Sequence, residues 1–270
     1  MTAFDAGAPD FQGEVLLQAA RVPHVGLGMT PTLLTVPALV EQGWNDQVLL
    51  DPIVTPVWRL WTYAKPAIVL GLAQRGMQLP VRPEADLPVM VRCSGGGAVL
   101  VGPWMLSISV ALPVEHPLVS DGVVASYAWL GRGIAQALES LGVGAQVLSP
   151  EQLRARRADP PVPTLDWACF GDVSPWEVLA HERKLVGLAQ IRRRNGVLLT
   201  AGILFRPCPW ETLCECLGRS RSDAERLRQC TISCEEFVGT ALQMQALVRS
   251  LHAMLGAECA PGDQGARAPG

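Results

Sequence analysis

The chain has 270 residues, of which 49% are hydrophobic and 17% are charged, so it can bury a sizeable core and extensive disorder is excluded. Its formal net charge of −3 gives no general attraction for nucleic acid or anionic lipid, and its apolar runs are far shorter than a membrane-spanning helix. We therefore expect a cytoplasmic protein with no nucleic-acid or membrane partner, which acts on a small ligand or a protein.

The first half of the chain is rich in predicted strands. Residues 1–30 are loose in composition and are predicted to form a flexible N-terminal tail. The second half of 33–50 has the spacing of a helix. Four β-like runs follow at 56–63, 67–74, 87–93 and 104–112, and the last of them alternates clearly.

The second half of the chain mixes helices with a hairpin. Apolar residues at helical intervals predict a helix over 126–142, and a loop rich in Arg and Pro is expected over 154–164. The pair Asn195-Gly196 between two apolar runs predicts a β-hairpin turn.

The C-terminal part is predicted to be helical. Helices are expected over 209–217 and 237–255, the second preceded by Ser233 and Glu236 in a capping-box pattern. Residues 257–270 are predicted to form a flexible tail, which leaves one domain over 31–256. Together these elements predict an α+β fold with mixed, mainly antiparallel sheets flanked by helices.

The eight cysteines are scattered through a long chain, which favours reduced thiols over a disulfide framework. Near the predicted C-terminal helices the spacings C-x5-C-x-C and C-x3-C do not match common zinc sites, and no histidine lies among them. We therefore expect no metal site, and we expect small buried hydrophobic residues at Cys208, Cys214, Cys216, Cys230 and Cys234.

The basic residues are unevenly chosen. Of 22, 20 are arginines and only Lys65 and Lys184 are lysines, so each lysine is a candidate for chemistry that a guanidinium cannot perform. Clusters at 154–157 and 192–194 are typical of solvated surface, and they could also steer the docking of an acidic partner.

Three consecutive glycines stand between two predicted strands, in the stretch RCSGGGAVL that begins at Arg92. Such a stretch exposes backbone N–H groups and lets a ligand lie directly on the main chain, which suits a phosphate, a carboxylate or a developing oxyanion. A bulge or tight turn would produce the same pattern. The spacings of a P-loop and of a dinucleotide fingerprint are absent.

A second segment starts at Cys169 and reads CFGDVSPWEVLAHERKLVGLAQIRRRNGVLLTAGILF. Together with RCSGGGAVL it resembles the biotin/lipoate protein ligase superfamily over about residues 33–206. The cysteine-phenylalanine pair ahead of the lysine is most similar to the bacterial octanoyltransferases that form a thioester on this cysteine. The resemblance implies the catalytic-domain fold of that superfamily.

The resemblance also implies an activity in lipoate metabolism. Cys169 would take an octanoyl or lipoyl group from an acyl-carrier protein and pass it to a lysine of a lipoyl domain or of the glycine cleavage H protein, without a cofactor. Lys184 is the second expected catalytic residue, because an ammonium near a thiol lowers the pKa of that thiol and polarises a thioester carbonyl. Expected substrate-binding residues are Arg92, Gly95, Gly96, Gly97, Ala98, Gly187, Ala189 and Gly202.

The chain departs from the superfamily pattern at four positions. Val101 and Ala201 stand where histidines are usual, and Val91 and Glu182 replace an arginine and a glycine. Two alternatives therefore remain open. One is an ATP- and magnesium-dependent lipoate-protein ligase that forms a lipoyl-adenylate. The other is a homologue that binds an acyl ligand without catalysis.

Overall fold

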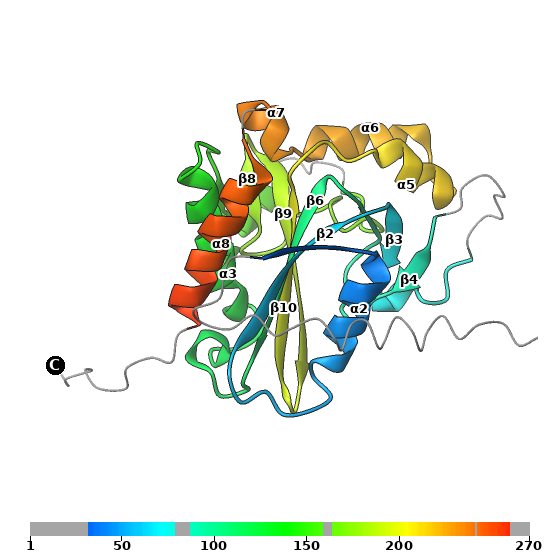
Figure 1. Ribbon diagram of the computed structural model, residues 1–270. Helices are drawn as coiled ribbons and strands as arrows, with labels where there is room; N and C mark the ends of the chain where they lie inside the picture. The colour runs from blue at the N-terminus through cyan, green and yellow to red at the C-terminus, as the bar shows by residue number, and fades with distance from the viewer. Residues whose placement is uncertain (1–31, 79–86, 159–163, 241, 260–270) are drawn as a thin grey trace, which may run out of the picture.

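The computed structural model describes residues 32–78, 87–158, 164–240 and 242–259. The tail predicted at 1–30 lies outside the described residues, as does all but the beginning of the tail predicted at 257–270. A seven-stranded sheet forms the centre (Figure 1), in the order β1-β2-β6-β10-β9-β8-β7. Its strands are β1 (Leu33–Val36), β2 (Val57–Tyr63), β6 (Met105–Leu112), β7 (Gln146–Val147), β8 (Val178–Ala180), β9 (Arg183–Arg193) and β10 (Gly196–Leu204).

Side-chain alternation gives this sheet two apolar faces. On β2, Trp58 points to one face and Trp61 to the other, because they are an odd number of residues apart. Trp58 makes an edge contact with His252 of α8 (Met244–Glu258). Trp61 makes an edge contact with Trp44 of α2 (Ala38–Gln47). Figure 1 accordingly shows α2 and α8 on opposite sides of the sheet, with α3 (Ser126–Glu139) beside α8.

A second sheet of three strands lies on the side of α2, in the order β4-β3-β5. It consists of β4 (Val89–Val91), β3 (Ala67–Leu70) and β5 (Val99–Val101). The glycine triplet lies in the connection between β4 and β5. The triplet at this small sheet lies against the backbone of Trp167 and Ala168.

The remaining helices are short. They are η1 (Leu72–Gln74), η2 (Pro117–Val119), α4 (Pro150–Ala158), α5 (Trp210–Cys216), α6 (Arg221–Cys230) and α7 (Cys234–Val238). Among the described residues, no helix is both long enough and apolar enough to cross a membrane.

The fold class is confirmed, since every strand pair of the central sheet except β1–β2 is antiparallel and helices flank it. The hairpin at Asn195-Gly196 is confirmed, with Gly196 paired to Arg193. The capping box is confirmed too, because the Ser233 hydroxyl accepts from the N–H of Glu236 and the Glu236 carboxylate accepts from the N–H of Ser233.

Two predictions about helices were wrong. The segment 154–164 was expected to be a loop, but α4 runs through Ala158; it is largely exposed, so it lacks the apolar stripe that would have indicated a helix. The single helix expected over 237–255 is broken. Gly239, with φ of +75°, ends α7 in a conformation that favours glycine, and α8 begins only at Met244.

Candidate active site

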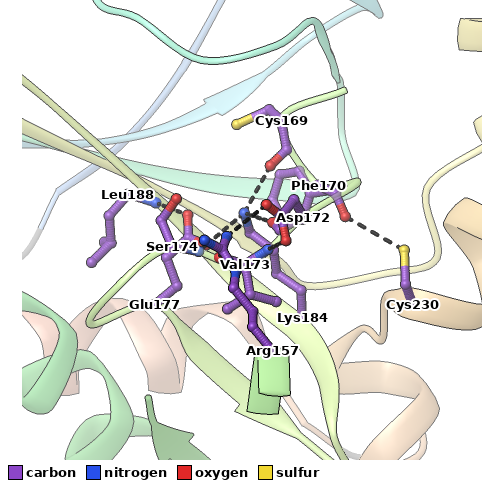
Figure 2. A network of polar contacts seen from close by, with 10 residues as sticks. All are labelled: Arg157, Cys169, Phe170, Asp172, Val173, Ser174, Glu177, Lys184, Leu188 and Cys230. Atoms are coloured by element: carbon purple, nitrogen blue, oxygen red, sulfur yellow. Dashed lines mark hydrogen bonds and ion pairs between the residues drawn. The ribbon is translucent and has the colours of Figure 1, made fainter. Parts of the chain in front are cut away.

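Lys184 is buried at the start of β9, with 2% of its surface exposed. Its Nζ lies 2.7 Å from Oε2 of Glu177 and donates hydrogen bonds to the carbonyl oxygens of Cys169 (2.7 Å) and Asp172 (2.8 Å). Figure 2 shows the ammonium at the centre of this network, directed at the carbonyl oxygen of Cys169. An ammonium has three N–H donors, so these three acceptors satisfy it completely.

Glu177 was not singled out by the sequence reasoning, although it lies within the segment that carries the resemblance. Its two carboxylate oxygens accept hydrogen bonds from the backbone N–H groups of Ser174 (2.7 Å) and Leu188 (3.0 Å). Burial raises the pKa of Glu177, and the charge of Lys184 opposes that shift. The ion pair thus links β9, the Ser174 turn and the Cys169–Asp172 segment.

The Cys169 thiol lies close to the Lys184 stem above a glycine of β9. A methyl group added at Gly187 would lie 3.5 Å from Cε of Lys184 and 3.7 Å from Sγ of Cys169. The backbone of Cys169 is fixed from the other side, because its N–H donates to the carbonyl oxygen of Ala98 (2.8 Å). The structure therefore brings together the two predicted catalytic residues beside Gly187.

A narrow cavity of about 70 Å³ opens beside the thiol, and we call it the thiol cavity. It lies between the two sheets, α2 and the Cys169 segment. Five predicted site residues line it, namely Arg92, Cys169, Gly187, Ala189 and Gly202. Most of its other walls are apolar side chains, including Val69, Val99, Val101, Met105, Phe170 and Leu188. Lys184, Ala98 and the glycine triplet are not among its lining residues.

The glycine triplet packs against the chain that leads to Cys169. A methyl group added at Gly97 would lie 2.5 Å from the carbonyl oxygen of Trp167, closer than any real contact allows. Gly96 has φ of +90°, a conformation that favours glycine, whereas nothing lies within 4 Å of a methyl group added at Gly95. Within the described part of the chain, no group accepts a hydrogen bond from the N–H of any of the three.

The Arg92 side chain binds the carbonyl oxygens of the glycine loop. One guanidinium nitrogen donates to the carbonyl oxygens of Gly95 and Gly97, both at 2.8 Å, and another donates to that of Val69 at 3.3 Å. Arg92 thus binds the loop through carbonyl oxygens, and the three glycine N–H groups have no acceptor in the described structure. Such a row of N–H groups suits a developing negative charge.

A polar cluster in the wall of the thiol cavity was missed by the sequence reasoning. Glu41 of α2 is 4% exposed, and its carboxyl group accepts a hydrogen bond from the Tyr63 hydroxyl at 2.5 Å. The same hydroxyl lies 2.7 Å from Oγ of Ser107. Burial, opposed by the hydrogen bond from Tyr63, raises the pKa of Glu41 from 4.5 to about 7. No sequence signal separates this glutamate from an exposed one on an amphipathic helix.

Comparison with known proteins decides the family. Residues 46–255 match the model of the lipoyl protein ligase A/B catalytic domain. The chain belongs to this family. The superfamily suggested by the two sequence segments is thereby confirmed.

Among its relatives in the lipoyl ligase family is the octanoyltransferase LipM of Kyrpidia tusciae, 28% identical over 264 residues that cover 92% of this chain and 91% of that protein. The octanoyltransferase LipM of Carboxydothermus hydrogenoformans is 27% identical over 168 residues. That match covers 60% of this chain and 59% of the relative, so it spans less than two thirds of that protein.

Solved structures of lipoate ligases share the fold. A lipoate-protein ligase A bound with ATP superimposes with a TM-score of 0.61 at 17% identity, over 85% of each chain. The Thermoplasma acidophilum protein Ta0514, a putative lipoate protein ligase with bound lipoic acid, gives a TM-score of 0.62 at 14% identity. That match covers 86% of this chain and 84% of the other.

The departures from the family pattern have distinct structural settings. Val101 and Ala201, which replace histidines, are both buried and both line the thiol cavity, so this cavity is less polar than the pattern would make it. Glu182, which replaces a glycine, lies in the β8–β9 turn with φ of +59°, next to His181 at +47°. Arg156 and Gln146 bind the Glu182 side chain and hold it in this strained turn.

Glu41 makes the stability of this lipoyl ligase family member depend on pH. Because its pKa is raised to about 7, the fold favours the protonated carboxyl, and this contribution is lost as the pH rises from 4.5 through 7. We compare the free energy of unfolding of Glu41→Gln with that of the native protein at two pH values. We expect the difference, variant minus native, to be about 2–3 kcal/mol larger at about pH 8 than at about pH 5. Urea unfolding at both pH values measures this difference. The exposed Glu139→Gln is the control, and an equal shift for it would contradict the assignment.

Proposed function

We propose that the protein is an octanoyltransferase of lipoate metabolism, which carries an octanoyl or lipoyl group as a thioester on Cys169. The observation that carries this proposal is the free Cys169 thiol at an apolar cavity, beside a loop whose N–H groups have no acceptor in the described structure. The LipM relatives support it. All eight cysteines are free, which suits a reducing compartment, and we place the reaction in the cytoplasm.

In the first half-reaction, the Cys169 thiolate attacks the thioester carbonyl of an octanoyl-loaded acyl-carrier protein. The bond from the carbonyl carbon to the carrier sulfur breaks, and the carrier thiol leaves with a proton. The N–H groups of Gly95–Gly97 are the proposed donors to the oxyanion formed in between. The apolar walls of the thiol cavity would hold the alkyl chain.

In the second half-reaction, a neutral lysine amine of a lipoyl domain or glycine cleavage H protein attacks the Cys169 thioester. The carbon–sulfur bond to Cys169 breaks, an amide forms, and the amine proton returns to the thiolate. The reaction balances without ATP or a metal ion, and we propose none. Among the described residues, no three His, Cys, Asp or Glu side chains lie together where they could hold a metal ion.

For Lys184 we propose a part other than polarising the substrate carbonyl. Since its three N–H donors are all taken, we propose that it fixes the Cys169 backbone and supplies a positive charge beside the thiol, instead of binding the substrate carbonyl directly.

Intact-protein mass spectrometry after incubation with octanoyl-loaded acyl-carrier protein tests the proposal. We expect a gain of one octanoyl group in the native protein and none in Cys169→Ser. Cys93→Ser is the matched control and should still be acylated, because Cys93 donates to Asp46 and burial raises the pKa of its thiol to about 11. Labelling of a lipoyl domain only with ATP, magnesium and free lipoate would establish a ligase instead.

A further inference from the structure

A second, larger cavity of about 990 Å³ lies beside the Cys169–Asp172 segment. Its walls come from α4, α6, the β8–β9 turn and residues 170–173. Four of its thirteen lining residues are arginines, so we call it the arginine groove: Arg156, Arg157, Arg183 and Arg226. The mechanism described above uses none of these four.

The arginine groove lies next to the nucleophile but does not contain the thiol. Phe170, the residue that follows Cys169, lines both the arginine groove and the thiol cavity. This one residue therefore separates the groove from the cavity. Cys230, in the wall of the groove, donates a hydrogen bond to the Phe170 carbonyl oxygen at 3.6 Å. In Figure 2 the Cys169 sulfur points away from both Arg157 and Cys230, which lie on different sides of this segment.

The groove is positively charged on a chain whose net charge is −3. Its four arginines outnumber its two lining carboxylates, Asp172 and Glu182, and Arg183 also lies 3.9 Å from Glu236, which is outside the lining. Arg157 pairs with Asp172 at 2.8 Å, and Arg156 pairs with Glu182. Within the described residues, no carboxylate pairs with the exposed Arg226. The groove therefore attracts a negatively charged surface.

We propose that the arginine groove is the docking surface for the acidic acyl-carrier protein that donates the octanoyl group. This inference rests on the proposed function. An acidic carrier can dock in the groove by charge complementarity while its acyl thioester reaches the thiol cavity, because Phe170 lines both. The acceptor lysine carries a positive charge until it loses a proton for attack, and the arginines disfavour its approach through the groove.

Direct binding tests the docking surface without any acyl transfer. Binding of unacylated carrier protein, measured by fluorescence anisotropy, is expected to weaken at least tenfold in Arg226→Glu and to weaken with added salt in the native protein. Arg249→Glu makes the same change of charge on α8 and should bind within twofold of the native protein. Unchanged binding by Arg226→Glu, or an equal loss in both variants, would overturn the proposal.

Two further measurements distinguish docking of the carrier from an effect at the thiol and from docking of the acceptor. Loading of Cys169 from octanoyl-pantetheine, which has no protein surface, should be unchanged in Arg226→Glu. A matching loss with that donor would place the effect at the thiol and overturn the docking role. Weakened binding of a lipoyl domain, with carrier binding intact, would assign the groove to the acceptor instead. If the native protein is never acylated, the proposed function fails, while carrier binding still decides the docking surface.

Discussion

Lys184→Met is expected to destabilise the protein by about 3–5 kcal/mol and to abolish acylation of Cys169. The substitution leaves the Glu177 carboxylate buried without its cation, and it removes the hydrogen bonds to the carbonyl oxygens of Cys169 and Asp172. An unpaired buried charge costs far more than the net contribution of the ion pair it came from. Urea unfolding gives the free energy of unfolding, and intact-protein mass spectrometry gives the acylation.

Two controls define this result. Lys65→Met removes the other lysine of the chain, which is exposed, and should change the unfolding free energy by less than about 0.5 kcal/mol. The double variant Lys184→Met, Glu177→Gln removes both charges and should recover part of the stability, but not the acylation. Equal stability of the single and double variants would show that the ion pair does not carry the effect.

Gly97→Ala is expected to cost about 1–3 kcal/mol or more and to slow acylation strongly. The new methyl group would lie 2.5 Å from the Trp167 carbonyl oxygen and 2.7 Å from the Ala168 carbonyl carbon. Both atoms belong to the backbone that leads into Cys169, and Ala98 is hydrogen-bonded to both Trp167 and Cys169, so we expect relief of the clash to shift the Cys169 backbone. Thermal unfolding and the rate of acylation measure the two effects.

Gly95→Ala is the matched control for this change, because it alters the same loop where nothing lies within 4 Å of the added methyl group. Alanine keeps the backbone N–H of Gly95, so this variant should stay within about 0.5 kcal/mol of the native protein and keep its acylation rate. Equal damage from both substitutions would mean that the triplet matters for its own flexibility and not for its contact with Trp167.

The sequence anticipated those features that depend on neighbours along the chain. The alternation of 104–112 predicted β6, Asn195-Gly196 predicted the hairpin, and Ser233 with Glu236 predicted the start of α7. Each signal is local, because it depends on side-chain period, turn conformation or capping within four residues.

Partnerships across the fold were not predictable in the same way. The Glu41 contact with Tyr63 spans 22 residues and the contact of Gly97 with Trp167 spans 70, so neither leaves a local pattern. The triplet was expected to make room for a ligand. The structure shows that Gly97 first makes room for the protein's own chain. The resemblance predicted Cys169 and Lys184 as site residues. It did not predict the three acceptors around the Lys184 ammonium, which only the structure shows.

The β8–β9 turn sets a direction for engineering a more stable protein. His181 and Glu182 both adopt positive φ without being glycine, and Phe237, Arg156 and Gln146 hold them there. Grafting Asn-Gly onto this pair would let the backbone adopt its shape unaided. Substitution of these two residues, which lie outside the thiol cavity, is therefore expected to give a more stable protein.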